Sequence, residues 1–190
     1  MKTILCVLAA VVLLGGCNIL PTSPPLPASH DFGPAATIPA MAGAPVEATV
    51  SASSWLDGTA IYYRLLYSSP TRLREYADNR WLAPPAELLQ ARLQAAFAGG
   101  RAGGYRLRVT LLDFEQEFAS AQSAQVSVRA VVELQDLASG ATVAQHLFTV
   151  SVPTSPDVQG AVQGASRAAD ELLAQLAQWT QTQLAGAKRK

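Results

Sequence analysis

The chain has few of the residues from which enzymes usually build active sites. It contains two histidines and two cysteines, and its 14 basic and 14 acidic side chains leave no net charge. A neutral balance without a basic face argues against nucleic-acid binding. The chain also lacks a glycine-rich phosphate loop and a Gly-x-Ser-x-Gly nucleophile elbow. We therefore expect a protein that is not an enzyme and that needs no metal or other cofactor.

Neither histidine is placed by a motif that would make it a catalyst. His30 lies in a proline-rich stretch, and His146 lies on the apolar side of an expected strand, between Ala144 and Phe148. A general base needs a partner within hydrogen-bonding reach, and no motif supplies one. We interpret His146 as a core or edge residue of the fold.

The first residues have the pattern of a secretory signal peptide. Lys2 precedes the apolar stretch Ile4 to Leu14, which is shorter than the roughly 20 residues of a spanning helix. The stretch ends in Leu14-Gly15-Gly16-Cys17, which resembles a lipobox. We therefore expect a lipoprotein signal peptide over residues 1–16, which contains Cys6, and lipidation of Cys17 with diacylglycerol and further acyl chains such as palmitate. Several acyl chains would anchor the protein stably to a membrane.

Residues 17–45 differ in composition from the rest of the chain. Seven prolines among small residues favour extended, semi-rigid backbone. We interpret this segment as a tether, in which His30-Asp31-Phe32-Gly33 is a candidate docking strand. A folded domain is expected over residues 46–185. The basic tail at 186–190 has two open interpretations, a solvated terminus or a contact with lipid headgroups.

Alternation of apolar and polar residues with period two predicts several half-buried strands. It is clear over residues 46–53, 61–65, 105–111 and 124–134. Ser139-Gly140 then predicts a hairpin into a further strand over 144–152. The alternation slips at Leu112, which indicates a β-bulge.

Two segments have the signals of helices. The first is expected to begin at Pro84-Pro85 and to end at Gly99-Gly100. The second is expected to begin with Ser155 as its N-cap and Pro156 at its first position, and an apolar stripe then continues to Trp179. Gly160 and Gly164 in this helix would allow a close approach to its neighbour. The order of elements predicts an α+β fold, a two-layer sandwich of a mainly antiparallel sheet with two helices on one face.

The segment from Trp55 to Pro85 is rich in tryptophan, tyrosine and arginine, which are favoured at protein interfaces. Two interpretations stay open. In one, Tyr63 and Trp81 fill the core and the arginines pair with nearby acids; in the other, the segment binds a partner. For Arg64 a structural pair or a stacking role is favoured over contact with a ligand. The candidate partner-binding residues are Trp55, Leu56, Asp57, Tyr62, Arg64, Tyr76, Arg80, Trp81, Pro84 and Pro85.

Short motifs follow one another along the chain in an order typical of one family. They are His30-Asp31-Phe32-Gly33-Pro34, Trp55-Leu56-Asp57-Gly58, Ile61-Tyr62-Tyr63-Arg64, Tyr76, Arg80-Trp81, Pro84-Pro85-Ala86-Glu87-Leu88-Leu89, Tyr105-Arg106-Leu107, Phe114-Glu115-Gln116-Glu117-Phe118 and a closing helix near Trp179. Behind a lipobox, this order resembles the ABC-type transport auxiliary lipoproteins, the auxiliary components of lipid transporters built around MCE domains.

The resemblance implies a docking role without catalysis. The partners would be a periplasmic MCE-domain protein and its inner-membrane permease and ATPase, which supplies the energy. Asn18 is not the aspartate associated with inner-membrane retention, which favours the periplasmic face of the outer membrane.

Two other functions stay open at this stage. A lipid carrier would need an apolar cavity of roughly several hundred Å³ for its cargo. An envelope scaffold lipoprotein would assemble as a homo-oligomer.

Overall fold

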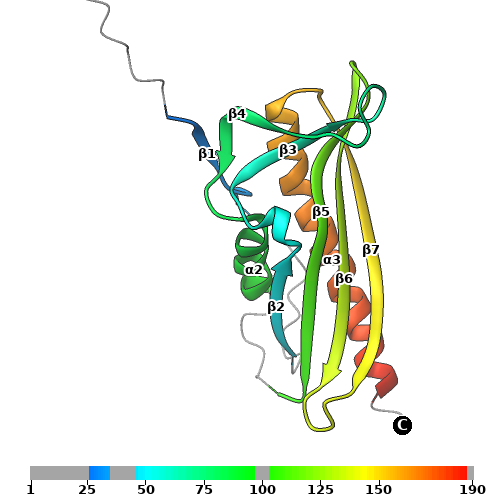
Figure 1. Ribbon diagram of the computed structural model, residues 1–190. Coiled ribbons are helices and arrows are strands. Elements are labelled where there is room, and N and C mark those ends of the chain that lie inside the picture. Colours follow the sequence, from blue (N-terminus) through cyan, green and yellow to red (C-terminus); the bar gives the residue numbers. More distant parts are fainter. Residues whose placement is uncertain (1–25, 35–45, 97–102, 188–190) are drawn as a thin grey trace, which may run out of the picture.

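The computed structural model describes residues 26–34, 46–96 and 103–187. The expected signal peptide, Cys17, Gly99-Gly100 and the last three residues lie outside the described residues. The described chain forms one seven-stranded sheet with two α-helices and a short 3-10 helix (Figure 1). The strands are β1 (Ala28–His30), β2 (Val46–Ala52), β3 (Ala60–Leu65), β4 (Leu73–Trp81), β5 (Tyr105–Ser120), β6 (Ser123–Asp136) and β7 (Thr142–Thr154). The helices are η1 (Ser54–Leu56), α2 (Pro85–Ala96) and α3 (Val158–Ala187).

The long strand β5 organises the sheet. Along one side it pairs antiparallel with β6, which in turn pairs antiparallel with β7. Along its other side β5 pairs parallel with β2 over its first half and parallel with β3 over its second half. The register of β5 against β6 shifts between Leu111 and Asp113, between these two halves. This confirms the bulge predicted at Leu112, and the bulge lies where β5 changes partner.

The α+β prediction is confirmed, and the sheet is mixed. The sheet order is β1-β4-β3-β5-β6-β7, with β2 also on β5, and β1 pairs parallel with β4. The strand β4 was not predicted, because most of its side chains are charged or polar and only its last residue, Trp81, is buried. The candidate docking strand near His30 is present as β1, which forms the outer end of the sheet beside β4.

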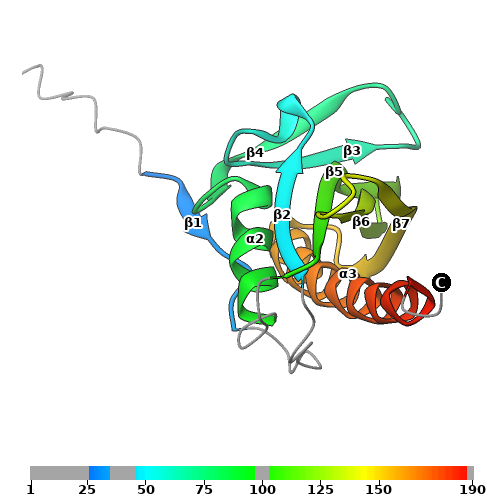
Figure 2. The ribbon, with the colours of Figure 1, turned by 90° about the horizontal axis from the view of Figure 1, so that it is seen from below.

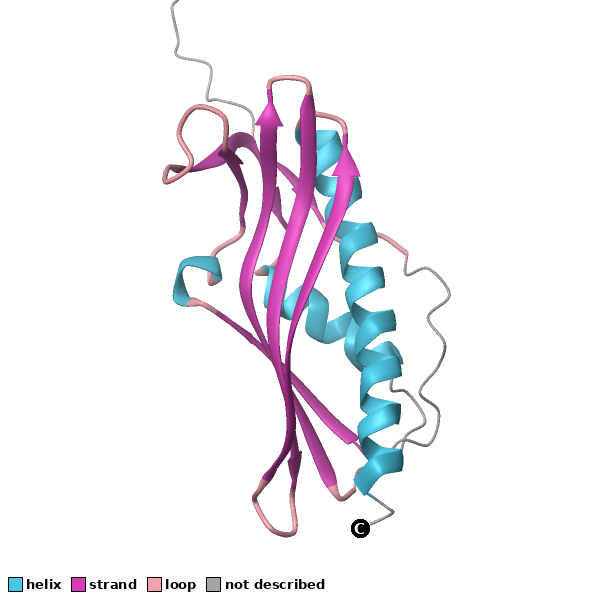
Figure 3. Ribbon diagram, turned by 90° about the vertical axis from the view of Figure 1, so that its right-hand side faces the viewer, coloured by secondary structure: helices cyan, strands magenta, loops and turns pink. Residues whose placement is uncertain are grey.

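The helix α3 runs along β7 and β6 and covers one face of the sheet (Figures 2 and 3). Its predicted stripe is buried from Ala165 to Leu176. A Cβ atom added to Gly164 would lie 2.3 Å from Thr154 Cγ2 and 2.8 Å from Val126 Cγ2. The close approach predicted at this glycine is therefore confirmed.

The beginning of α3 differs from the prediction. Its N-cap is Asp157, whose Oδ1 accepts hydrogen bonds from the Gly160 N–H at 2.6 Å and from the Ser155 hydroxyl at 3.0 Å. The expected N-cap, Ser155, therefore lies two residues too early. The Ser155 hydroxyl donates to the Asp157 carboxylate instead. The negative charge of Asp157 is stabilised by the positive end of the helix dipole.

The helix α2 closes an exposed edge of the sheet. Gln90 accepts a hydrogen bond from the Val50 N–H at 2.6 Å and donates one to the Ala48 carbonyl at 3.1 Å. These contacts satisfy backbone groups of β2 that would otherwise be free for pairing with another strand. The start of α2 at Pro85 confirms the prediction from Pro84-Pro85.

The layer between α3 and the sheet is tightly packed. A cavity lined by Ile61, Trp81, Phe114, Val126 and Ala165, among others, has a volume of only about 10 Å³. This is about the space that one water molecule needs. The layer between α3 and the sheet therefore has no room for an acyl chain at this point.

Candidate functional site

The candidate partner-binding residues divide into buried and accessible groups. Leu56, Trp81 and Pro85 are buried in the core and present no side chain to a partner. The other seven are accessible: Trp55, Tyr62, Arg64, Tyr76 and Pro84 are half-buried, and Asp57 and Arg80 are exposed. We call these seven residues the β3–β4 face.

Arg64 has a different partner from those expected among nearby acids. Its Nε and Nη2 donate to Glu115 on β5 at 2.8 and 3.0 Å, and its Nη1 donates to the Pro70 carbonyl at 3.2 Å. Burial raises the pKa of Glu115, and the hydrogen bonds from Arg64 oppose this rise. The same pair raises the pKa of Arg64. Of the two favoured interpretations of Arg64, the structural pair matches this geometry.

A second polar chain passes from β4 through the sheet to the start of α3. The Tyr76 hydroxyl donates to Gln116 Oε1 at 2.6 Å. Gln116 Nε2 then donates to Thr154 Oγ1 and to the Ser155 carbonyl, both at 2.8 Å. Burial raises the pKa of Tyr76, so that its phenol keeps the proton that it donates. Tyr76 therefore links the β3–β4 face to the rest of the fold.

An open groove lies on the β3–β4 face beside these residues. It has a volume of about 470 Å³ and is lined by Tyr62, Tyr63, Arg72, Arg74 and Glu75, among others. Arg72 is exposed, and the Nε atom of Arg74 is buried without a hydrogen-bond partner. Two guanidinium groups beside two tyrosines can bind a carboxylate and pack against an apolar side chain at the same time.

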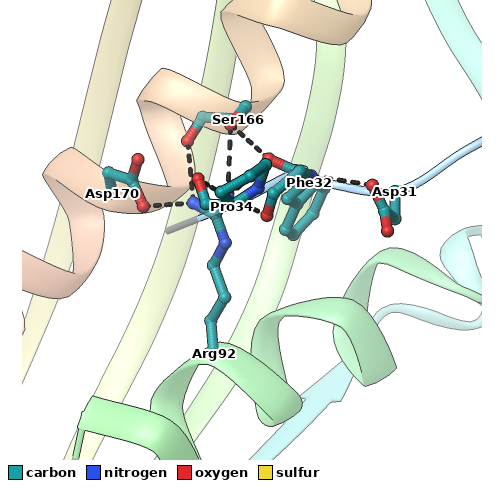
Figure 4. A network of polar contacts seen from close by, with 7 residues as sticks. Asp31, Phe32, Pro34, Arg92, Ser166 and Asp170 are labelled. Carbon is teal, nitrogen blue, oxygen red and sulfur yellow. Dashed lines mark hydrogen bonds and ion pairs between the residues drawn. The ribbon is translucent and has the colours of Figure 1, made fainter. Parts of the chain in front are cut away.

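Arg92 of α2 is a buried cation that the sequence analysis missed (Figure 4). Its Nη1 bonds to Asp170 and donates to the Ser166 carbonyl, both on α3. Its Nη2 donates to the carbonyls of Phe32 and Gly33. One guanidinium therefore joins α2, α3 and the segment that follows β1. The available signal was an arginine between Leu89 and Leu93 on the apolar side of the helix.

The segment Asp31–Pro34, which we call the strap, is part of the folded core. The ring of Phe32 is 4% exposed and packs against Trp81 and Phe114 with centroid distances of 5.4 and 5.5 Å. Asp31 Oδ1 accepts a hydrogen bond from the Gly33 N–H at 2.8 Å, and Gly33 has a φ of 67°, which suits glycine. The packed structure thus begins before residue 46, the start expected for the folded domain.

Both histidines contact neighbouring side chains of the sheet or of α3. His30 Nε2 lies 2.8 Å from Asn79 Oδ1, which ties β1 to β4. His146 is exposed on β7, with its ring 4.6 Å from that of Phe148 and 6.3 Å from that of Trp179. Within residues 26–34, 46–96 and 103–187, no cluster of three or more histidine, cysteine or acidic side chains could hold a metal ion.

None of the helices in the described part of the chain is both long and apolar enough to cross a membrane.

Two solved structures share this fold at low sequence identity. A crystal structure of a Xanthomonas campestris protein of the DUF330 family is 20% identical, with a TM-score of 0.70, and covers 86% of this chain and 96% of its own. A crystal structure of an uncharacterized protein has a TM-score of 0.61 at 16% identity, over 81% of this chain and 98% of its own. A PelC dodecamer from Paraburkholderia phytofirmans is less similar, with a TM-score of 0.36 at 15% identity over 70% of this chain and 90% of its own. A search of curated proteins finds no match.

The comparison with protein families agrees with the resemblance seen in the short motifs. The family model for the ABC-type transport auxiliary lipoprotein component matches residues 33–177, from the strap to the middle of α3. A transport auxiliary role is not a catalytic one. The chain therefore belongs to the ABC-type transport auxiliary lipoprotein component family.

Proposed function

We propose that this protein is the docking subunit of an MCE-type ABC lipid transporter. It is anchored by acyl chains on Cys17 to the periplasmic face of the outer membrane. There it binds the periplasmic MCE-domain protein, whose permease and ATPase lie in the inner membrane. The observation that carries the proposal is the family match over residues 33–177, which assigns an auxiliary role in ABC transport.

The β3–β4 face is the proposed contact surface for the MCE-domain protein. Tyr62 and Arg72 line its groove and reach solvent, so they can contact a partner directly. Arg64 and Tyr76 hold the face in place through Glu115 and Gln116. Because arginine and tyrosine carry much of the energy of protein interfaces, this groove supports a docking role.

Enclosure of a lipid inside the domain is a less favoured function. A carrier needs a cavity of roughly several hundred Å³. The cavity between α3 and the sheet measures about 10 Å³. No observation on the described residues favours the homo-oligomeric scaffold over the docking role.

Site-specific photo-crosslinking in intact cells tests the proposed contact. A benzophenone amino acid replaces Tyr62 in the groove, and the matched control replaces Gln145, an exposed residue on β7. The proposal expects a crosslink to an MCE-domain protein from position 62 and none from position 145. Recovery of equal products from both positions, or of no MCE-domain protein, would contradict it.

A second experiment distinguishes loss of contact with the partner from loss of stability of the domain. Arg72→Ala should reduce co-purification of the MCE-domain protein while the unfolding midpoint of the domain changes little, because Arg72 is exposed. Tyr62→Ala should reduce co-purification and also lower the unfolding midpoint, because Tyr62 is half-buried and packs against the core. If both variants lost the partner only in proportion to lost stability, the groove would not be the contact surface.

A further inference from the structure

The edge of the sheet at β1 carries unusually exposed apolar side chains. Leu26 is 89% exposed and Leu82 is 66% exposed, more than any other large hydrophobic residue in the described part of the chain. Leu82 is held in place, since its N–H donates to the His30 carbonyl at 2.6 Å. We call Leu26, β1, Arg80 and Leu82 the β1 edge. Single exposed leucines are common on protein surfaces, so the function of this edge has to be inferred from the residues that surround the leucines.

Cations flank these leucines. Arg80 is exposed and donates from its Nε to Ser29 Oγ at 3.1 Å. On the other side, a groove of about 750 Å³ is lined by the strap and by α3, which contributes exposed Arg167. Nη2 of Arg167 donates to the Pro153 carbonyl at 3.0 Å, and the side chain still reaches solvent. The acids nearby are Asp31, whose carboxylate already accepts the Gly33 N–H, and Asp78 on β4.

The position of the β1 edge in the chain limits where it can lie. Leu26 comes nine residues after Cys17, and an extended chain of that length spans at most about 30 Å. The helix α3 has 30 residues and is therefore about 45 Å long. The β1 edge lies at the upper left of the molecule in Figure 1, whereas the hairpin between β6 and β7 lies at the bottom. A membrane anchor on Cys17 therefore keeps the β1 edge close to the bilayer.

We propose that the β1 edge rests on the lipid surface that holds the acylated Cys17. Leu26 and Leu82 enter the boundary between headgroups and acyl chains, while Arg80 and Arg167 face lipid phosphates. Apolar side chains flanked by arginines are the usual chemistry of such interfacial contacts. The short stretch of chain between Cys17 and Leu26 gives the edge a high effective concentration at the surface, so that weak contacts suffice. The proposal rests on the anchorage in the proposed function, and it assigns Arg80 to the membrane instead of the partner.

Depth-dependent fluorescence in vesicles tests this orientation. The full lipidated chain is reconstituted in vesicles of phosphatidylethanolamine and phosphatidylglycerol, with Leu82→Cys or Val143→Cys carrying a polarity-sensitive dye. Val143 is the matched control, because it is also an exposed apolar residue but lies at the hairpin end of β7. Acylation of Cys17 and removal of Cys6 leave no free thiol, so the parent chain should take up no dye.

The proposal expects brominated lipids to quench the dye several-fold more strongly at position 82 than at position 143. Arg80→Glu in the Leu82→Cys chain should weaken that quenching, since it replaces a cation by an anion at the lipid phosphates. Equal quenching at both positions, or none at position 82, overturns the orientation while the anchor stands. A parent chain that fails to float with the vesicles, or that takes up dye at Cys17, overturns the anchorage and the orientation together.

Discussion

Arg64 of β3 and Glu115 of β5 form a two-point ion pair across neighbouring parallel strands, with distances of 2.8 and 3.0 Å. The Glu115 side chain is 4% exposed, and that of Arg64 is 20% exposed. The pair therefore fixes β3 against β5 at the base of the β3–β4 face. Removal of either side chain leaves the charge of the other one at least partly buried without a counter-ion.

Replacement of Arg64 by methionine should destabilise the domain near neutral pH. The change leaves the Glu115 carboxylate buried without its cation, at a cost of roughly 3 kcal/mol in the free energy of unfolding. Glu115→Gln should cost less, because the neutral amide no longer pays the desolvation that raises the Glu115 pKa. Urea unfolding of the two variants beside the parent chain measures the difference. An Arg64→Met variant as stable as the parent would contradict this account.

The same pair predicts how stability depends on pH. Because the folded-state pKa of Glu115 is raised, the native state holds this proton more tightly than the unfolded chain does. Its contribution is therefore greatest below the unfolded value of 4.5 and is lost as pH rises through the folded pKa. In Arg64→Met that pKa rises further, so stability should fall more steeply above pH 4.5 than in the parent. Adding Glu115→Gln to Arg64→Met should remove the extra dependence of stability on pH. If that dependence persisted, a titratable group other than Glu115 would be responsible.

Tyr76→Phe should lower the stability of the domain without removing a contact with the partner. The change removes the donor to Gln116, which is 1% exposed, and should lower the free energy of unfolding by about 1 to 3 kcal/mol. Partner binding should survive once the variant is folded, since Tyr76 acts through Gln116. Differential scanning calorimetry and co-purification test the two parts. Loss of the partner with unchanged stability would make Tyr76 a contact residue instead.

Two glycines of α3 should respond in opposite directions to alanine. Gly164→Ala pushes a methyl group into Thr154 and Val126, and should destabilise by about 1 to 3 kcal/mol. Gly186→Ala meets nothing within 4 Å, so its effect should be neutral or stabilising by up to roughly 1 kcal/mol. Thermal unfolding measures both variants. Equal melting temperatures would show that α3 can move away from the sheet at Gly164.

Arg92→Lys should release the strap from the domain. The lysine keeps the charge, but a single ammonium group cannot reproduce the fork that reaches Asp170, Ser166 and the carbonyls of the strap. Amide exchange over residues 28–34 should become faster, with a smaller change over β6. Phe32→Ala removes the aromatic contact instead and should cost about 3 to 5 kcal/mol. Unchanged exchange in Arg92→Lys would show that the Phe32 ring and the Ser166 hydroxyl hold the strap without the Arg92 fork.

Period-two alternation located the strands that have one buried face, including β2 over its full length and the bulge in β5. The alternation failed for β4, where Trp81 alone is buried. The parallel pairings of β1 with β4, and of β2 and β3 with β5, could not be predicted either. They join strands that are far apart along the chain. Local hydrophobic pattern does not encode such long-range partners.

Less of the candidate site was predictable than of the fold. Composition marked the segment from Trp55 to Pro85, but it could not separate buried Trp81 from accessible Tyr62, since both types occur in cores and interfaces. The partner of Arg64 was misplaced, because Glu115 is 51 residues away in sequence. Arg92 was missed because its acceptors are backbone carbonyls and helix residues that converge only in the folded domain.

The strap also determines the order in which the protein can be completed. Ser166 and Phe32, which meet at the strap, are 134 residues apart, and α3 is the last element of the chain. In the proposed lipoprotein, which would be exported N-terminus first, the strap emerges long before the helix that holds it. The contacts that hold the strap on α3 can therefore form only after the rest of the described domain has emerged.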